Sequence, residues 1–416
     1  MDSIDLFSPA FKADPFPTYA ALRAAHPVYP HATRGRAARD HSAPDGRTIW
    51  YVTRYDDVAA VLKDEEAFCK NPGNVDLTGP RRPVRSAQNF NDNMLFSDPP
   101  DHTRLRALVG QAFTPRRVAG MGERIRETAE NLLDRMAAAG AADLIAAYAR
   151  PLPVVVISDL LGIPAADRET VSDWSQAIIS PGSRGLNYSA RKHKIRAFVH
   201  YLRDLFVRRL ADPRDDLISD LVRAEDAGDR LNEAELFSMV ALLLVTGHET
   251  TVNLIGNGAL ALLRHPEQRE RLRVNPGLWP SAVEELLRYD GPVETSTTRW
   301  VRRDTSFRGH AMRAGNVMRP VITSANRDPA HFIRPDELDI GRADNRHLAF
   351  GLGAHYCLGA SLARLEGSIA LGSLLERLPD IRLAIPAGQL AWRSGVLFRG
   401  LHRLPVAWAA DIRIMT

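Results

Sequence analysis

The residue best suited to chemistry is Cys357, which lies in the glycine-rich stretch Ala349–Ala360 (AFGLGAHYCLGA). A helix-forming sequence follows from Leu358 to Leu375. Glycine allows backbone conformations and close approaches that a Cβ atom would block. A cysteine at the start of a helix faces unpaired N–H groups and the positive end of the helix dipole. We therefore expect a lowered pKa for Cys357, and a thiolate that can bind a soft metal ion.

An isolated cysteine has a simpler interpretation as a small buried side chain, since free cysteine is among the most buried residue types. The full spacing, F-x-x-G-x-x-x-C-x-G from Phe350 to Gly359, argues against that here. It resembles the haem-binding loop of the cytochrome P450 family, in which the cysteine is the proximal ligand of haem iron. The resemblance implies that Cys357 binds the iron and that the following residues contact the cofactor: Phe350, Gly351, Leu358, Gly359 and Ala363.

A second motif lies inside a long helix predicted from Leu231 to Arg264, where an apolar run precedes the sequence TGHETT at residues 246–251. An interior glycine costs about 1 kcal/mol relative to alanine. Threonine hydroxyls inside a helix can bond the carbonyl four residues back and bend the helix. We therefore expect a local opening of the helix at Gly247. The alternative is an ordinary irregularity beside an unpaired surface acid.

This second motif resembles the oxygen-binding groove of the P450 family, [AG]-G-x-[DE]-T. The resemblance implies that Thr250 donates a hydrogen bond toward dioxygen and that Glu249 relays protons from water. It also places Thr246 and Gly247 against the haem. Thr246 replaces the usual small residue, so its methyl and hydroxyl groups would narrow the groove or add a hydrogen bond, and would line the substrate pocket.

Basic residues that could hold carboxylates occur in several segments. His102 and Arg106 are four apart and share a helix face, which alone indicates an exposed pair. Following Asp-Pro-Pro, however, the pair resembles the family helix that holds a haem propionate, and arginine suits a bidentate grip on a carboxylate. By the same resemblance Arg299 binds the second propionate and His355 also reaches a propionate.

The substrate side is predicted from two further segments. Pro292 to Val301 is predicted to be extended, and the resemblance places Val293 beside the substrate. The segment from Trp392 to Trp408 resembles the closing β-hairpin of the family, with Val396 and Leu397 near the tip that points into the pocket.

One pair is assigned to folding. Glu285 and Arg288 lie three apart on a predicted helix from Ser281 to Tyr289, and such a pair is ordinarily worth a few tenths of a kcal/mol. Its position between the two motifs resembles the E-x-x-R core network of the family. Arg319-Pro320 departs from the family, because an apolar strand usually runs there.

Composition predicts a soluble protein. The chain has 416 residues, 45% hydrophobic and 25% charged, and no linker or repeat divides it, so one catalytic domain over residues 1–416 is expected. A net charge of +4 does not indicate nucleic-acid binding. The two cysteines, Cys69 and Cys357, provide no disulfide framework and fit a reducing cytoplasm. Residues 1–14 lack a signal-peptide pattern, and the apolar run 236–245 is shorter than the ~20 residues that span a membrane.

The resemblance covers nearly the whole chain and implies a mainly α fold with a smaller β region. It implies a haem b monooxygenase that hydroxylates or epoxidises a hydrophobic small molecule such as a macrolide or polyketide, a steroid or a fatty acid. Electrons would come from a separate ferredoxin and reductase, since the chain has no flavin or iron–sulfur motif. Three alternatives are a non-oxygenating haem sensor or carrier, a peroxide-driven haem-thiolate enzyme, and a haem-free helical binding module.

Overall fold

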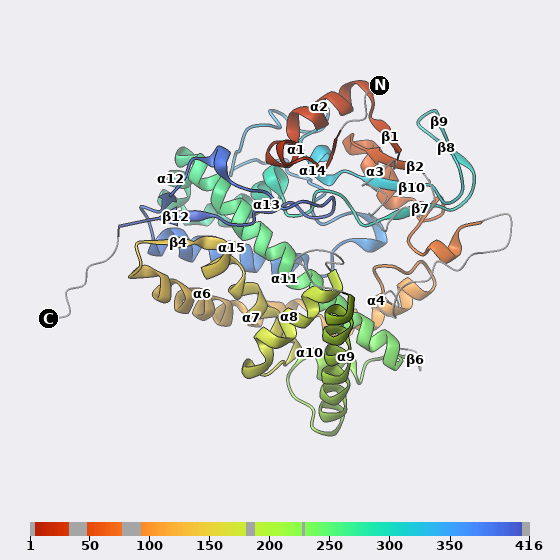
Figure 1. The fold of residues 1–416 in the computed structure, drawn as a ribbon, viewed down its shortest axis with the longest axis horizontal. Helices are drawn as coiled ribbons and strands as arrows, with labels where there is room; N and C mark the ends of the chain where they lie inside the picture. Colours follow the sequence, from red (N-terminus) through yellow and green to blue (C-terminus); the bar gives the residue numbers. More distant parts are fainter. Residues whose placement is uncertain (1–4, 33–47, 77–92, 180–187, 227–228, 410–416) are drawn as a thin grey trace.

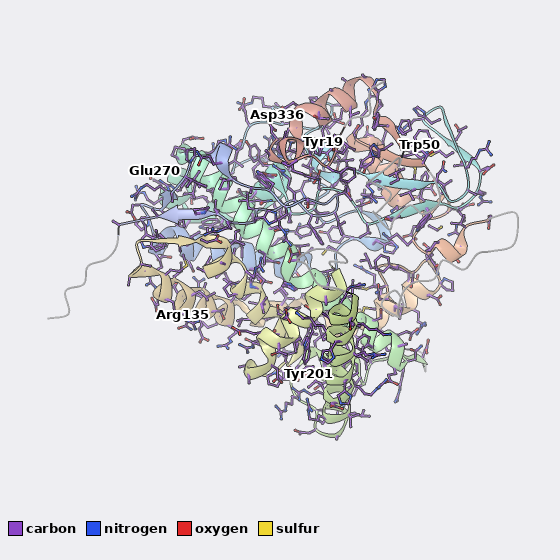
Figure 2. The ribbon with its side chains drawn as sticks, in the orientation of Figure 1. Tyr19, Trp50, Arg135, Tyr201, Glu270 and Asp336 are labelled. Atoms are coloured by element: carbon purple, nitrogen blue, oxygen red, sulfur yellow. The ribbon has the colours of Figure 1, made fainter. Side chains whose placement is uncertain are left out.

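The computed structural model describes residues 5–32, 48–76, 93–179, 188–226 and 229–409. Helices form the larger part of the molecule, and a smaller β region lies beside the N-terminal helices (Figure 1). This is the fold class expected from the sequence. Figure 2 shows the side chains on this fold, with Tyr19 among the N-terminal helices and Tyr201 on the long helix α9 (Tyr188–Ala211) at the opposite end of the molecule.

The helices of the described residues vary in length from single turns to the long α9 and α11. Their bounds are α1 Pro9–Ala13, α2 Phe16–Ala25, α3 Tyr55–Lys63, α4 Asp101–Ala112, α5 Pro115–Gly120, α6 Gly122–Ala137, α7 Pro151–Leu161, α8 Arg168–Ile179, α9 Tyr188–Ala211, α10 Leu217–Leu221, α11 Glu233–Arg264, α12 Pro266–Val274, α13 Trp279–Asp290, α14 Ile322–Ala325 and α15 Ala360–Arg377. The predicted loop at 180–188 lies almost wholly outside the described residues, as does much of the irregular segment predicted at 69–95.

The main sheet has the strand order β1-β2-β10-β7-β3. β10 pairs in parallel with β2 and antiparallel with β7, so segments distant in sequence meet at its centre. Smaller sheets have the orders β11-β12-β4, β5-β6 and β8-β9. The strand bounds are β1 Val28–Ala32, β2 Thr48–Val52, β3 Phe68–Cys69, β4 Ala141–Asp143, β5 Glu225–Asp226, β6 Asp229–Arg230, β7 Arg299–Val301, β8 Thr305–Phe307, β9 His310–Met312, β10 Val317–Pro320, β11 Arg382–Leu383 and β12 Pro405–Ala407.

α11 is the central helix of the core. It begins at a capping box, in which Asn232 and Glu235 each bond the other's backbone N–H group. Among the described residues it is the one helix long and apolar enough to cross a membrane, yet 72% of its most apolar window is buried inside the protein. α11 is therefore a core helix, around which the largest hydrophobic cluster is built.

The glycines of α11 let neighbouring helices approach closely. A Cβ atom at Gly247 would lie 2.9 Å from Ile157 Cδ1 of α7, and one at Gly258 would lie 2.9 Å from Leu371 Cδ1 of α15. The helix runs unbroken through Gly247, so the local opening expected there is not seen. The physical reason for glycine at this position is packing against α7, which leaves no room for a side chain.

The Arg319-Pro320 departure is accommodated at the centre of the sheet. Arg319 is buried, and its guanidinium lies over the ring of Tyr51 at 5.9 Å from the centroid. Pro320 ends β10, where its carbonyl accepts a hydrogen bond from the Ser296 N–H at 2.8 Å. An aromatic face thus replaces the apolar contact that the strand would otherwise make.

Candidate active site

The cysteine loop is shaped by two glycines with positive φ. Gly351 has φ 74° and Gly353 has φ 76°, a region that other residues rarely adopt. A Cβ atom at Gly353 would also lie 3.0 Å from the Leu62 carbonyl of α3. The Cys357 N–H donates to the Phe350 carbonyl at 2.9 Å, which closes the loop. The glycine spacing therefore fixes where the thiol lies.

The expected lowering of the Cys357 pKa was wrong. Burial raises the pKa of this thiol, and the opposing effects of the Gly359 N–H and of Arg106 and Arg364 are smaller. The helix begins only at Ala360, so the cysteine stands before its first turn and gains less from the dipole than expected. The side chain is nevertheless exposed. Protein atoms surround and desolvate the sulfur, yet it can still be reached, and a bound metal cation deprotonates a coordinating thiol outright.

A cluster of basic groups surrounds His355, two residues before Cys357, and we call it the basic cluster: Lys70, His102, Arg106, Arg299 and His355. The rings of His102 and His355 are 4.1 Å apart between centroids. Burial, together with the smaller effects of the charges of Lys70, His102, Arg299 and Arg106, lowers the pKa of His355 to about 2. Burial also lowers the pKa of His102 and of Arg299.

Several polar atoms of the basic cluster are buried without a hydrogen-bond partner among the described residues: His102 Nε2, His355 Nε2 and Arg299 Nε. The nearest acids do not offset the excess positive charge. The Asp98 carboxylate accepts hydrogen bonds from the backbone N–H groups of Lys70 and Asn71 at 2.7 and 3.0 Å. Glu65 Oε1 is 3.8 Å from His355 Nε2, too far for a hydrogen bond. Buried nitrogen atoms without partners, beside the positive charges of Arg106 and Arg299, indicate a site for an anion, and carboxylates match the geometry of arginine and imidazole donors.

Lys70 belongs to this cluster although sequence reasoning missed it. The side chain is buried and donates to the Thr297 hydroxyl and to the Thr298 carbonyl at 3.3 Å. Burial lowers the pKa of Lys70 well below its ordinary value. The only sequence signal was a lysine directly after the apolar pair Phe68-Cys69 of β3. That signal does not reveal that β3 pairs with β7, the strand that begins at Arg299.

The hydroxyl groups of the α11 motif all bond the helix backbone. Thr246 Oγ1 donates to the Leu242 carbonyl at 2.8 Å, and Thr250 Oγ1 donates to the Thr246 carbonyl at 2.8 Å. Thr246 therefore adds a hydrogen bond within the helix and leaves the one at Thr250 intact. The expected donation from Thr250 toward dioxygen would require its hydroxyl to rotate, whereas its lone pairs can accept a proton donor without any movement.

Glu249 is buried and forms an ion pair with Arg393 of the C-terminal segment. Its other oxygen is 4.0 Å from His248 Nε2. The alternative of an unpaired surface acid is thus excluded. Sequence reasoning missed Arg393, because nothing in the local sequence shows that residue 393 folds back onto α11.

The predicted substrate-facing residues come together from two segments. Val293 and Phe398 form an antiparallel bridge, and the Glu294 N–H donates to the Leu397 carbonyl at 2.9 Å. Thr295 Oγ1 donates to the Val396 carbonyl at 2.8 Å. Val293, Val396 and Leu397 are all partly exposed and lie on one two-stranded edge.

The Glu285–Arg288 pair is a fully buried network. Two parallel hydrogen bonds join the side chains, at 2.7 and 2.8 Å. Arg288 also donates to three carbonyls, of Asn326, Pro335 and Glu337, and Arg342 Nε donates to Glu285 at 3.0 Å. This is far more than an exposed helical pair, and it ties α13 to the segment that leads into the cysteine loop.

These features agree with the comparisons to known proteins. A family model described as Cytochrome P450 matches residues 278–379. The polyketide biosynthesis cytochrome P450 PksS of Bacillus subtilis (strain 168) is 46% identical over 86% of this chain and 88% of that protein. The cytochrome P450 monooxygenase PikC of Streptomyces venezuelae is 44% identical over 96% of this chain and 92% of that protein. The chain belongs to the cytochrome P450 family.

Solved structures of P450s support the assignment. The structure of PksS from Bacillus subtilis 168 has a TM-score of 0.87 at 42% identity, and covers 97% of this chain and 98% of that one. The structure of myxobacterial CYP267B1 in complex with myristic acid has a TM-score of 0.87 at 41% identity, over 97% and 99%. The chain is thus a P450 monooxygenase, an oxidoreductase with a haem-thiolate cofactor. Its residues fit that cofactor, because an exposed cysteine lies near a basic cluster in which three buried nitrogen atoms have no hydrogen-bond partner among the described residues.

Proposed function

We propose that this P450 inserts one oxygen atom of dioxygen into a hydrophobic small molecule, by hydroxylation or epoxidation, in the secondary metabolism of a bacterial cytoplasm. The substrate class is a macrolide or other polyketide, with steroids and fatty acids as neighbouring classes. Haem b is the cofactor, residues 1–416 form one catalytic domain, and a separate ferredoxin and reductase supply the electrons.

The observation that carries this proposal is the exposed Cys357 side chain near the basic cluster, whose Arg106 is close enough to act on the pKa of the thiol. The substrate class is supported by relatives with such names, which include a mycinamicin IV hydroxylase/epoxidase of Micromonospora griseorubida at 44% identity and a vitamin D(3) 25-hydroxylase of Pseudonocardia autotrophica at 42%. One structural neighbour was solved with a hexadecenoic acid ligated to acyl carrier protein, so a carrier-bound substrate is a further option for this chain.

The roles of the chain's own residues follow from their positions. Cys357 holds the haem iron, and His102, Arg106, Arg299 and His355 hold the propionates. Phe350 packs at 4.5 Å from the Arg364 guanidinium, and with Gly351, Leu358, Gly359 and Ala363 supports the ligand loop. When bound, the haem supplies the oxidising chemistry through a thiolate ligand that favours O–O cleavage. Thr246 and the 293–295 and 396–398 edge orient the substrate.

Glu249 and Thr250 supply the protons that convert one oxygen atom of dioxygen to water. Glu249 takes a proton from solvent, and Thr250 provides the hydroxyl nearest the groove. Thr250→Ala should keep haem but divert reduced oxygen to hydrogen peroxide, because the hydroxyl that directs protons is lost. Peroxide formed per NADPH consumed measures this. Tight coupling of electrons to product in Thr250→Ala would contradict the role given to the hydroxyl.

The experiment that tests the whole proposal is the optical spectrum of the dithionite-reduced protein with carbon monoxide. A strongly red-shifted Soret band is expected from thiolate ligation. Haem-replete protein would then be titrated with macrolactones, steroids and long-chain fatty acids, and a high-spin shift identifies the class that binds. A band at the ordinary histidine-haem position, or no haem band in folded protein, would overturn the proposal.

A further inference from the structure

The ion pair between Glu249 and Arg393 joins the proton-donating acid to the C-terminal segment. The Arg393 side chain is 24% exposed, whereas that of Glu249 is 6% exposed. The guanidinium therefore reaches from solvent to a carboxylate that is otherwise buried.

The hairpin that carries Arg393 is fixed to the same helix that carries Glu249. The Arg393 N–H donates to the Gly400 carbonyl at 2.9 Å, and Trp392 forms a bridge with Leu401. Asn257 Nδ2 of α11 donates to the Arg399 carbonyl at 3.0 Å. With both strands of the hairpin held, the backbone positions of Arg393 and Glu249 relative to each other are set by the fold.

The backbone of the hairpin lies directly against α11. A Cβ atom at Gly400 would lie 2.0 Å from Asn253 Oδ1, so only glycine allows this approach. Asn253 is one turn beyond Glu249, and its Nδ2 is buried without a hydrogen-bond partner among the described residues. Asn257 Oδ1, one turn further, is likewise unpaired. The seam between α11 and the hairpin is thus polar, and unpaired amide atoms of this kind are the usual partners of buried water.

We propose that Arg393 is the positioning residue of the proton-delivery acid. Through the ion pair it holds the Glu249 carboxylate turned toward the solvent-exposed edge at the hairpin, where the acid accepts a proton from water. This inference rests on the proton-delivery role proposed for Glu249 and Thr250.

The carboxyl group of Glu249 has two orientations, and its protonation state decides between them. The ionised carboxylate is held by Arg393, because opposite charges attract strongly in a site with little water. Uptake of one proton from a solvent water neutralises the carboxylate, weakens the pair and frees the side chain to turn toward Thr250. Release of that proton regenerates the carboxylate, which pairs with Arg393 again. One proton moves from solvent to the groove, and Arg393 keeps its own protons throughout.

The groups facing Glu249 come from three elements. Arg393 lies on the hairpin, His248 on α11 itself, and Arg150, at the N-cap of α7, acts on the same histidine. Burial lowers the pKa of His248, and its Nδ1 lies 2.6 Å from the Leu244 carbonyl. A neutral histidine cannot replace the charge of Arg393, so the arginine is the group to change.

The first test measures Glu249 itself by infrared difference spectroscopy during a pH titration of the haem-loaded protein. The carboxyl band lost in Glu249→Gln identifies the acid. In Arg393→Gln that band should titrate at a pH about one unit higher, the lower end of the effect of a nearby opposite charge. Arg393→Lys should restore most of the wild-type titration. An unchanged titration in Arg393→Gln would overturn the proposal.

The second test measures where electrons go, with a ferredoxin and reductase pair and myristic acid as the probe. In Arg393→Gln the rate of proton-dependent oxygen reduction should fall about tenfold, less than the ~100-fold that a misplaced catalytic group can cost. Peroxide per NADPH should rise accordingly, and the solvent isotope effect should change. Arg403→Gln is the matched control, since Arg403 lies on the same segment but is 74% exposed and pairs with Asp143.

The outcomes separate this inference from the function on which it rests. If Glu249→Gln and Thr250→Ala raise peroxide but Arg393→Gln behaves as Arg403→Gln does, only the positioning role of Arg393 fails. If Glu249→Gln itself leaves peroxide unchanged, the proton-delivery role fails. Should Arg393→Gln lose haem or unfold, Arg393→Lys decides the matter, because it keeps the positive charge and should titrate close to the wild type, with a small shift for the displaced charge.

Discussion

Two buried charged clusters in this protein differ in one respect, which is whether their polar atoms are paired. In the Glu285–Arg288 network, both side chains are completely buried, and each makes several hydrogen bonds. In the basic cluster around His355, ring and guanidinium nitrogens are buried without partners among the described residues. A cluster whose polar atoms are all hydrogen-bonded holds the fold together. A cluster with unpaired polar atoms can bind a ligand of opposite charge.

The largest effect is expected when one partner of the Glu285–Arg288 network is replaced. Glu285→Gln should reduce the free energy of unfolding by about 3–5 kcal/mol, because Arg288 is left buried with a neutral partner. Urea unfolding followed by circular dichroism measures this. Glu270→Gln is the matched control, since Glu270 and Arg273 have the same spacing on an exposed helix face and should give no measurable change. Equal effects in the two variants would contradict the assignment.

Cys357→Ser separates ligand binding from folding. We expect loss of the red-shifted carbon monoxide band and of all monooxygenase activity, since serine does not provide a soft thiolate for the iron. The urea midpoint of the haem-free protein should stay close to that of the wild type, because the exposed side chain contributes little packing. A large fall in the stability of haem-free protein would show that the thiol has a structural role as well.

His102→Phe tests the unpaired cluster. Haem affinity should fall by about 1.5–3 kcal/mol, the usual contribution of a hydrogen bond to a charged group. The haem-free protein should be as stable as the wild type or slightly more stable, because an unpaired buried nitrogen is replaced by an apolar group of similar shape. Haem transfer to apomyoglobin measures the affinity. His331→Phe, at a histidine stacked on Tyr55, is the control that should leave haem affinity unchanged.

The smallest expected effect concerns pH. Hydrogen bonds from His347 and Arg364 outweigh burial and lower the pKa of Glu284 to about 2. The folded protein therefore binds this proton less readily than the unfolded chain, so the stabilisation is complete above about pH 4.5 and is lost as pH falls toward 2. Urea midpoints measured across that range should slope less in Glu284→Gln than in the wild type. Parallel slopes would contradict this contribution.

Local patterns predicted much of the fold. The sequence from Tyr55 to Lys63 has helical spacing, which predicts a helix, and α3 has those bounds in the structure. The helix predicted from Leu231 to Arg264 is found from Glu233 to Arg264. Both carry strong helical periodicity, and the longer one has a capping box. The residues of the cysteine loop were identified because glycine spacing dictates backbone conformation, as the positive φ of Gly351 and Gly353 shows.

Other features depend on contacts that no local pattern contains. The pKa of Cys357 was predicted with the wrong sign because the helix dipole is visible in sequence while desolvation by distant segments is not. Gly247 was interpreted as an opening, although the reason for it is Ile157 on another helix. Lys70 and Arg393 were missed because each enters the site from a segment whose position is set by tertiary pairing.

The loop beside the substrate edge joins the beginning, middle and end of the chain. Lys12 Nζ and the Tyr19 hydroxyl each donate to Glu294 at 2.6 Å, the Glu294 N–H donates to Leu397, and Arg399 donates to the Lys12 carbonyl at 2.7 Å. During synthesis, helix α11 and the cysteine loop leave the ribosome before residues 396–398, which pair with residues 293–295. A nascent chain stalled before residue 397 would therefore contain its ligand loop but lack one side of the substrate edge.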